Sequence, residues 1–263
     1  MVIRHGVVPR LLLLMQDSTT SPLKMHLAHA LGSLAKGSDQ HRKELIDHGV
    51  FPVLISILAR PETCASPKLV EACLGCIRSV ASHPEAPIDI IYSDEAFVPH
   101  LIAIMAGPSP VNQIAVATIF ACACKVFFHF SRREETILAL TILPRVSQTA
   151  KQQNTLVEVN VIPTLNLLLC TPNENVQLPA LQCLSCLVFN NEDAALQVSR
   201  SAYNGRHLIG DIVALIERNR GTEMQLAGAK CLTYMCRCGI IDDRNPTILF
   251  KVLPCLVSCV VSQ

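Results

Sequence analysis

Apolar residues recur along the chain in a six-residue pattern: a variable first residue, two apolar residues, a proline, any residue and a leucine. In chain order the full copies are Gly6–Leu11, Gly49–Leu54, Ala96–Leu101, Asn160–Leu165 and Lys251–Leu256. A degenerate copy, His207–Ile212, lies before the last of these and has Gly210 in place of the proline. The steps from copy to copy are 43, 47, 64, 47 and 44 residues. Because four of the five steps are nearly equal, the pattern predicts a repeated structural unit.

Each proline predicts the start of a helix. Proline costs little in the first helical turn, because its missing N–H group would have no partner there and its ring presets a helical φ angle. Leucine-rich segments follow four of the prolines, at Leu11–Met15, Leu54–Leu58, Leu101–Met105 and Leu165–Leu169. Polar clusters such as Asp17–Pro22 and Thr171–Asn175 predict where these helices end.

A second segment recurs at similar steps and predicts another helix. Its copies are Ala30–Leu34, Cys73–Ile77, Thr118–Cys122, Cys183–Leu187 and Cys231–Met235. Small residues three positions apart, followed by a larger aliphatic residue, are typical of a helix face packed closely against its neighbour. Residues Ser38–His48 predict a shorter helix before the next proline.

Three helices in each unit, the first one short, and a period between about 40 and 47 residues are typical of armadillo repeats. We therefore predict an all-α, right-handed α-solenoid of armadillo/HEAT type. It would have five to six repeats in a single domain over residues 1–263. We expect this solenoid to be truncated at both ends, with apolar surface exposed there and a tendency to aggregate or to depend on partners.

The step of 64 residues is long because a stretch at 126–149 interrupts the third repeat. One interpretation is an insertion that forms a loop on one face of the solenoid. Another is that these residues do not belong to the repeat, for example as an untranslated stretch carried into the predicted gene. Joining Lys125 to Ala150 restores the common spacing. Sequencing the messenger RNA distinguishes the two interpretations.

Composition narrows the function classes. Half of the residues are apolar and 4% are aromatic, which favours closely packed helices with an aliphatic core. The net charge is +1 and the basic residues are scattered, so nucleic acid is not an expected partner. Thirteen cysteines without a signal-peptide core are typical of reduced thiols and predict a cytoplasmic and nuclear protein. No membrane span is expected, because the most apolar stretch, 114–130, contains Lys125 and His129 and is shorter than about 20 residues.

Candidate chemistry is sparse. Two pairs have metal-ligand spacing, Cys73/Cys76 and Cys183/Cys186. Other copies of the same helix have Ala30/Ser33 or Cys231/Tyr234 in those positions. A packing position tolerates that exchange and a metal ligand does not, so we interpret the four cysteines as buried small side chains. Phosphate-binding loops and hydrolase motifs are missing from the sequence, and we predict no enzyme, catalytic residue, metal or cofactor.

The residues also resemble those of a known family. The matching segments are Val8–Leu12, Leu31–Ala35, Val70–Leu74, Val98–Leu101, Glu223–Arg237 and Leu253–Val257. They are similar to the armadillo repeat-containing protein 8 family of CTLH (GID-type) E3 ubiquitin ligase subunits. The resemblance implies a catalytically inert scaffold in ubiquitin-dependent protein degradation, with LisH/CTLH-domain ligase subunits and a substrate receptor as partners. It also implies that the chain corresponds to the N-terminal portion of longer proteins, without the receptor-binding part.

Protein partners are expected on the inner face of the solenoid, which successive third helices line. The candidate partner-binding residues on these helices are Glu71, Arg78, Gln182, Lys230, Tyr234 and Arg237. The alternative that these residues contact only solvent also stays open. A second function also stays open, that of a free-standing armadillo adaptor or transport receptor that binds linear peptide motifs.

Importin-like and catenin-like armadillo repeats hold a peptide backbone with an asparagine on each third helix. The aligned positions here are Ser33, Cys76, Ala121, Cys186 and Tyr234. The resemblance to those proteins therefore does not extend to an asparagine ladder, which disfavours that mode of peptide binding.

Overall fold

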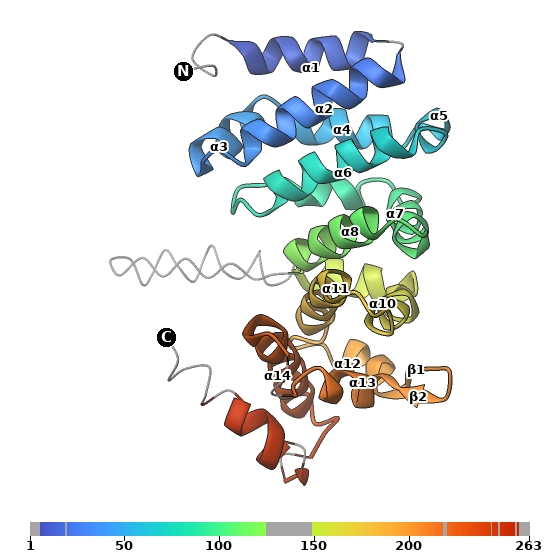
Figure 1. Ribbon diagram of the computed structural model, residues 1–263, viewed down its shortest axis with the longest axis vertical. Helices are drawn as coiled ribbons and strands as arrows, with labels where there is room; N and C mark the ends of the chain where they lie inside the picture. The colour runs from blue at the N-terminus through green and yellow to red at the C-terminus, as the bar shows by residue number, and fades with distance from the viewer. Residues whose placement is uncertain are drawn as a thin grey trace. The chain divides into compact units, whose positions relative to one another are not determined.

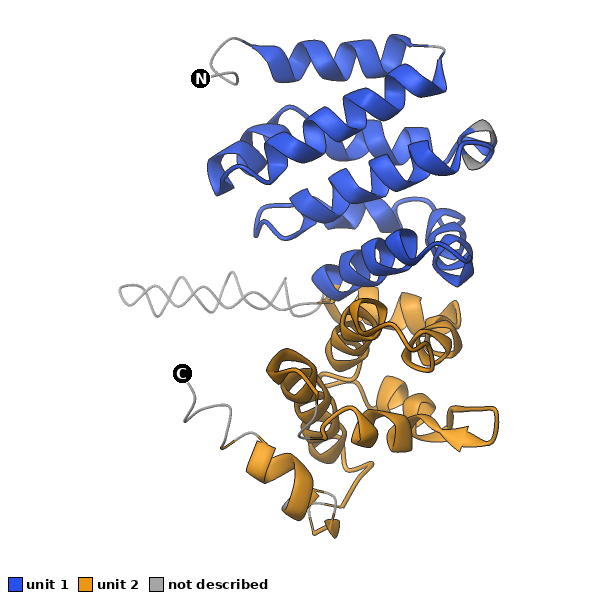
Figure 2. Ribbon diagram, in the orientation of Figure 1, with its two compact units in different colours: residues 1–123 blue, residues 124–263 orange. Residues whose placement is uncertain are grey.

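The computed structural model describes residues 6–18, 20–124, 149–217, 220–242, 244–246, 248–255 and 257. The chain divides into two compact units, 1–123 and 124–263, which Figure 2 shows in blue and orange. The described residues are helical, apart from connecting loops and one short hairpin in the second unit. The prediction of an all-α armadillo solenoid is confirmed. That residues 1–263 form a single domain stays a prediction.

The first unit stacks three layers of helices. They are α1 (Val7–Asp17) and α2 (Ser21–Ala35); then α3 (Asp39–Asp47), α4 (Val50–Leu58), α5 (Pro61–Cys64) and α6 (Pro67–Ala81); then the 3₁₀ helix η2 (Ile88–Tyr92), α7 (Phe97–Ala106) and α8 (Pro110–Ala123). The helices α2, α6 and α8 are the third helices of their repeats, and α6 packs against both others (Figure 1). Helix α3 confirms the short first helix predicted at Ser38–His48. The Ser38 hydroxyl caps it by accepting a hydrogen bond from the His41 N–H at 3.2 Å.

The second unit contains two further repeats. Its elements are helical residues 149–158, α10 (Val161–Leu169) and α11 (Glu174–Leu187); then α12 (Glu192–Arg200), β1 (Ala202–Tyr203), β2 (Arg206–His207), α13 (Leu208–Ala214) and α14 (Thr222–Arg237); and finally the π-helix η3 (Ile248–Val252). Strands β1 and β2 form an antiparallel hairpin in which Ala202 pairs with His207 and Tyr203 with Arg206. The third helices α11 and α14 pack against each other (Figure 1).

Backbone conformation sets where the second helix of a repeat begins. The prolines occupy the third helical residue of α1, α4, α7 and α10, as predicted for Pro9, Pro52, Pro99 and Pro163. The residue before the helix is left-handed at three of these starts, namely Gly6 (φ 65°), Gly49 (φ 77°) and Asn160 (φ 58°). Glycine, and to a lesser degree asparagine, adopt this conformation at low cost, so the chain turns sharply there and starts a new helix.

Pro254 does not follow this rule, and the prediction that it begins a helix is wrong. The residues before it already form η3, and residues 253–255 continue as α-helix. Lys251 stands where three other copies have a left-handed glycine or asparagine. A lysine in that conformation costs about 1–2 kcal/mol. Lys251 is accordingly part of η3 and does not form a turn before a new helix.

Small residues let the third helices approach closely. A Cβ atom added to Gly32 of α2 would lie 3.4 Å from the Cα of Cys76 in α6. Cys73, Cys76 and Cys183 are buried, which confirms that they are packing residues. For Cys186 that interpretation is wrong, because it lies toward the open side of α11 and is only half-buried.

A glutamine at the fourth residue of three third helices donates hydrogen bonds to backbone carbonyls of the segment that leads into that helix. The Nε2 group of Gln113 donates to the Gly107 carbonyl at 2.8 Å. Gln177 donates to the Leu169 and Thr171 carbonyls at 2.9 and 2.7 Å. Gln225 donates in the same way to the carbonyls of Glu217 and Arg220. This position was not among the predicted ones, although the glutamines follow the repeat with steps of 64 and 48 residues.

The predicted insertion at 126–149 lies outside the described residues, except for Thr149. Thr149 is helical and buried, so the last residue assigned to the insertion is part of the first helix of a repeat. Within the described part of the chain, no helix is long and apolar enough to cross a membrane.

Candidate protein-interaction surface

Helix α14 presents three of the predicted partner-binding residues on one side. Lys230, Tyr234 and Arg237 are spaced four and three residues apart, which places them on the same face of a helix. Lys230 and Arg237 are exposed and Tyr234 is half-buried. This side of α14 therefore offers two positive charges flanking an aromatic ring.

Helix α11 and the turn after it present the equivalent positions of the preceding repeat. Gln182, Cys186 and Phe189 lie 48 residues before Lys230, Tyr234 and Arg237, respectively. Gln182 is exposed, and the other two are half-buried. We call the surface formed by Gln182, Phe189, Lys230, Tyr234 and Arg237 the α11–α14 face.

An aromatic cluster joins the two helices of this face. The rings of Phe189 and Tyr234 meet edge to face, with centroids 4.9 Å apart and an interplanar angle of 71°. The Arg237 guanidinium carbon lies 5.9 Å from the Phe189 ring centroid, a cation–π arrangement. Burial, together with the nearby Cys186 thiol, raises the pKa of the Tyr234 hydroxyl. Tyr234 is therefore a neutral hydrogen-bonding group at physiological pH.

The turn that carries Phe189 is tied down by side chains from neighbouring helices. Gln153 donates through Nε2 to the carbonyls of Cys186 and Phe189, at 2.6 and 3.2 Å. The Asn191 amide donates to Asn154 Oδ1 at 2.8 Å, and its own Oδ1 accepts from the first turn of α12. These contacts hold the backbone of the turn that carries Phe189. Phe189 lies beyond the end of α11, so helix periodicity did not identify it, although the repeat step of 48 residues that separates it from Arg237 could have done so.

Glu71 and Arg78 lie in the first unit and are not part of the α11–α14 face. Both are half-buried on α6 and are seven residues apart. The Glu71 carboxylate accepts a hydrogen bond from the Ser109 hydroxyl at 2.8 Å, just before α8 begins. Glu71 therefore joins two helices of the first unit. Of the six predicted residues, Lys230, Tyr234 and Arg237 share one side of α14, and Gln182 lies on α11, which packs against α14.

The buried thiols stay protonated and unreactive at neutral pH. Burial raises the pKa of Cys73 and of Cys231 to about 12, and it also raises the pKa of Cys76. A protonated thiol is a poor nucleophile and a poor metal ligand. Among the described residues, no three His, Cys, Asp or Glu side chains are grouped so that they could hold a metal ion.

No family model matches the chain. It is 34% identical over 253 residues to armadillo repeat-containing protein 8 of Mus musculus, and equally so to that of Danio rerio, with 96% of the chain aligned. It spans about a third of the length of these relatives, 33%. It is also 22% identical over 217 residues to importin subunit alpha-1b of Oryza sativa subsp. japonica, which covers 73% of this chain and 39% of the importin.

Solved structures agree with this fold. An engineered protein matches with a TM-score of 0.65 and 17% identity, over 97% of this chain and 96% of its own. Computationally designed armadillo repeat proteins for modular peptide recognition match with a TM-score of 0.65 and 15% identity, over 88% of this chain and 83% of theirs. A designed armadillo repeat protein in complex with the peptide (KR)4 matches with a TM-score of 0.55 and 14% identity, over 96% of this chain and 99% of its own. The chain therefore has the armadillo repeat fold, and along 96% of its length it is similar in sequence to part of armadillo repeat-containing protein 8.

Proposed function

We propose that the chain is a non-catalytic scaffold in a CTLH/GID-type E3 ubiquitin ligase. There it contacts LisH/CTLH-domain subunits and supports ubiquitin-dependent, proteasomal protein degradation in the cytoplasm and nucleus. The observation that carries this proposal is the 34% identity to armadillo repeat-containing protein 8 across 96% of the chain. Because the chain spans 33% of that relative, we assign it the N-terminal contacts to the ligase core and assign the substrate receptor to the remaining length.

The packing between neighbouring repeats supports the proposed scaffold role. Within each unit the third helices pack on one another, as α6 does on α2 and α8 and as α14 does on α11, and a glutamine fixes the loop before the third helix in three repeats. Repeats joined in this way hold surface residues at fixed spacing over several layers. Such a surface binds partners through pre-ordered side chains, which lowers the entropic cost of association.

Affinity purification tests the proposal. The full chain is expressed with a tag in cells, and the proteins that co-purify are identified by mass spectrometry. We expect LisH/CTLH-domain subunits in near-stoichiometric amounts. Their absence, with a purified chain whose helical circular dichroism is intact, would contradict the proposal. The charge-reversal variant Lys230→Glu/Arg237→Glu, compared with Lys68→Glu on α6, then reports whether the α11–α14 face makes the contact.

A second candidate is a free-standing adaptor or transport receptor that binds linear peptides, and the α11–α14 face favours it. Lys230 and Arg237 are basic, and Phe189 with Tyr234 offers aromatic edges for apolar side chains. By charge complementarity such a face selects an acidic segment that carries apolar residues. The designed relative in complex with (KR)4 holds a basic peptide instead.

Peptide binding at this face would not use an asparagine ladder. On α11 and α14 the positions aligned with those asparagines are Cys186 and Tyr234, and neither has the carboxamide that would hold a peptide backbone. On the described third helices, the one asparagine that is exposed is Asn175, in the first turn of α11. The face would therefore hold a peptide by its side chains rather than by its backbone.

Fluorescence anisotropy separates this candidate from the first. Labelled acidic and basic peptides of matched length are titrated with the full chain at two salt concentrations. The adaptor hypothesis predicts that the acidic peptide binds, that added salt weakens binding, and that Lys230→Glu/Arg237→Glu reduces affinity about tenfold while Lys68→Glu does not. Equal binding of both peptides, or equal effects of the two variants, would reject it.

A further inference from the structure

Two leucines adjoin the α11–α14 face toward the beginning of its helices. Leu178 of α11 lies 48 residues before Leu226 of α14, so the two hold equivalent positions in successive repeats. Both side chains are half-buried. Because α11 packs against α14, these leucines add a second apolar contact next to the aromatic rings of Phe189 and Tyr234. We call Leu178 and Leu226 the leucine pair, and Phe189 and Tyr234 the aromatic pair.

Apolar and positively charged groups alternate along one side of α14. In chain order this side presents Leu226, Lys230, Tyr234 and Arg237. Their spacing of four, four and three residues keeps them on the same face of the helix. At a rise of about 1.5 Å per residue, Leu226 and Tyr234 are about 12 Å apart along the helix axis, and Lys230 and Arg237 are about 10 Å apart. A complementary ligand therefore alternates apolar and acidic groups at the same intervals.

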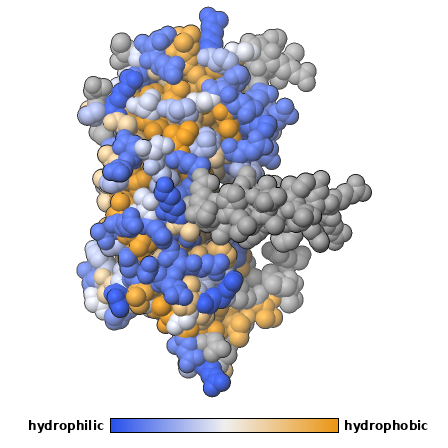
Figure 3. Space-filling view, turned by 180° about the vertical axis from the view of Figure 1, so that it is seen from behind, coloured by the Kyte–Doolittle hydropathy of each residue, from blue (hydrophilic) through white to orange (hydrophobic). Residues whose placement is uncertain are grey.

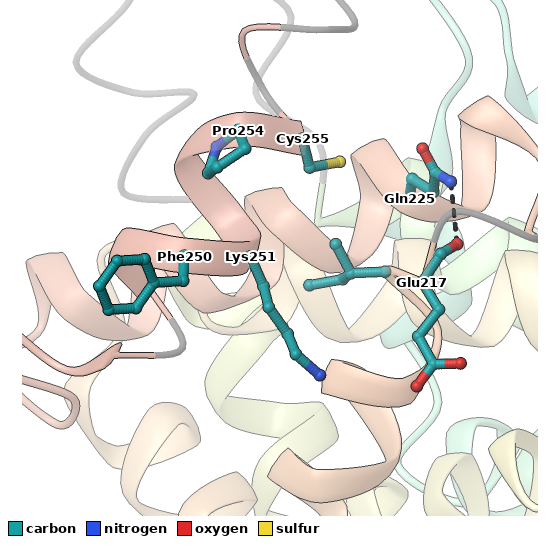
Figure 4. Close-up of a pocket in the computed structure, with 7 residues that line it drawn as sticks. Glu217, Gln225, Phe250, Lys251, Pro254 and Cys255 are labelled. Carbon is teal, nitrogen blue, oxygen red and sulfur yellow. Dashed lines mark hydrogen bonds between the residues drawn. The ribbon is translucent and has the colours of Figure 1, made fainter.

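Other sides of α14 are covered within the second unit. Helices α11 and α13 and the C-terminal η3 pack against it. Figure 4 shows Lys251 and Cys255 of the C-terminal segment across a pocket of about 470 Å³ from Gln225, near the start of α14. Among the described residues these contacts leave Lys230 and Arg237 exposed. Figure 3 shows hydrophilic and hydrophobic residues interspersed on the second unit away from its C-terminal end, so a partner meets a mixed surface there.

Backbone hydrogen bonds determine which conformation of a ligand the face suits. An extended peptide brings one N–H and one C=O group per residue, and burying these groups without partners is unfavourable. Cys186 and Tyr234 offer no carboxamide to such a backbone, and the exposed carboxamides on α11 and α14 are those of Asn175 and Gln182. An α-helix pairs its backbone groups internally and needs no such partners. The face therefore suits a helix better than a strand.

We propose that the α11–α14 face and the leucine pair bind an α-helix of a partner protein that lies along α14. This helix carries two acidic residues seven positions apart, with apolar residues three or four positions from each. The inference rests on the second candidate function, in which this face binds an acidic segment.

The spacing of the partner follows from that of α14. Seven residues of a helix span about 10 Å, so two acidic side chains would pair with Lys230 and Arg237. The apolar residues would contact the aromatic pair and the leucine pair, as the anchors of a helix in a groove do. Glu223 is exposed at the beginning of α14 and would repel a further acidic residue, which limits the register.

Two synthetic peptides test the conformation of the ligand on the full chain. Both are fluorescein-labelled, of equal length and charge, with two glutamates and two leucines each. In the helical-register peptide, which is alanine-based, the glutamates are seven positions apart with the leucines midway between them. In the strand-register peptide the glutamates are three positions apart, also about 10 Å in an extended chain, and flanking prolines prevent a helix. We expect anisotropy titrations to show at least about tenfold tighter binding of the helical-register peptide.

A charge exchange tests the register. Lys230→Glu should weaken binding of the helical-register peptide about tenfold, and Lys68→Glu on α6 should leave it unchanged. Changing one of the two peptide glutamates to lysine should recover the affinity of Lys230→Glu, whereas changing the other should not. Lys230 and Lys68 are both exposed, so circular dichroism should show both variants folded.

The outcomes separate the inference from the function on which it rests. Equal or tighter binding of the strand-register peptide overturns the helical ligand but leaves the binding of acidic segments in place. Recovery by both exchanged peptides, or by neither, overturns the proposed register. If neither peptide binds the natural sequence, the face does not take acidic segments, and both the inference and the second candidate function are rejected.

Discussion

Gln177→Met is expected to destabilise the protein by loosening the joint between α10 and α11. The Gln177 side chain is 6% exposed, and its Nε2 group serves two backbone carbonyls, those of Leu169 and Thr171, at 2.9 and 2.7 Å. Methionine has nearly the same length and shape but no hydrogen-bond donor. The substitution therefore removes both hydrogen bonds while it leaves the packing of the side chain nearly unchanged.

The magnitude follows from two opposing contributions. Each lost hydrogen bond costs about 1 kcal/mol, and the carbonyl that stays buried without a donor adds to that cost. Against this, Gln177 Oε1 is itself buried without a hydrogen-bond partner among the described residues, and the substitution removes that unfavourable group. The net loss in the free energy of unfolding is about 1–2 kcal/mol, which lowers Tm by about 2–4 °C for each kcal/mol.

Two equivalent glutamines provide a graded control. Gln225 also serves two carbonyls but is half-buried, so water replaces part of what Gln225→Met removes. Gln113 is half-buried and serves one carbonyl. We expect losses in the order Gln177→Met, Gln225→Met, Gln113→Met, with the last near 0.5 kcal/mol.

Urea unfolding followed by far-ultraviolet circular dichroism measures the three losses. The urea concentrations at the unfolding midpoint are compared between variants. They report a change in stability when the slope of the free energy against urea is unchanged, because that slope depends on the surface exposed on unfolding. The reasoning is refuted if Gln177→Met is as stable as the natural sequence, or if Gln113→Met costs more than Gln177→Met.

Three further substitutions probe other parts of the structure. Gly49→Ala places a side chain at a φ of 77° and should lower the free energy of unfolding by about 1 kcal/mol, measured by urea unfolding. Gly228→Ala puts a Cβ atom 2.8 Å from Ile216 Cγ1, so its Tm should fall, and adding Ile216→Ala should recover part of the loss. Burial raises the pKa of Cys73 and Cys231 from 9.0 to about 12. The unfolded chain therefore releases these protons first, and stability should fall as pH rises from about 9 toward 12. Cys73→Ala/Cys231→Ala should flatten that decline in unfolding midpoints measured across the pH range.

Local chemistry in the sequence determined the repeat and most of its helix boundaries. A proline in the first turn, preceded by a glycine or asparagine that turns the chain, acts within a few residues and needs no partner from elsewhere. Four second helices begin where Pro9, Pro52, Pro99 and Pro163 predict, and three of the four follow such a glycine or asparagine. The small residues of the third helices likewise predicted close packing, which Gly32 beside Cys76 confirms.

The tertiary structure decided which residues share a surface. Phe189 lies past the end of its helix, and only the packing of α11 on α14 brings its ring to Tyr234 and Arg237. Glu71, predicted on the same grounds as Lys230, instead accepts a hydrogen bond in the other unit. Periodicity places a side chain on one side of its own helix, whereas exposure and neighbours depend on the helix packed alongside. That helix comes from residues about one repeat away, beyond the reach of a local pattern.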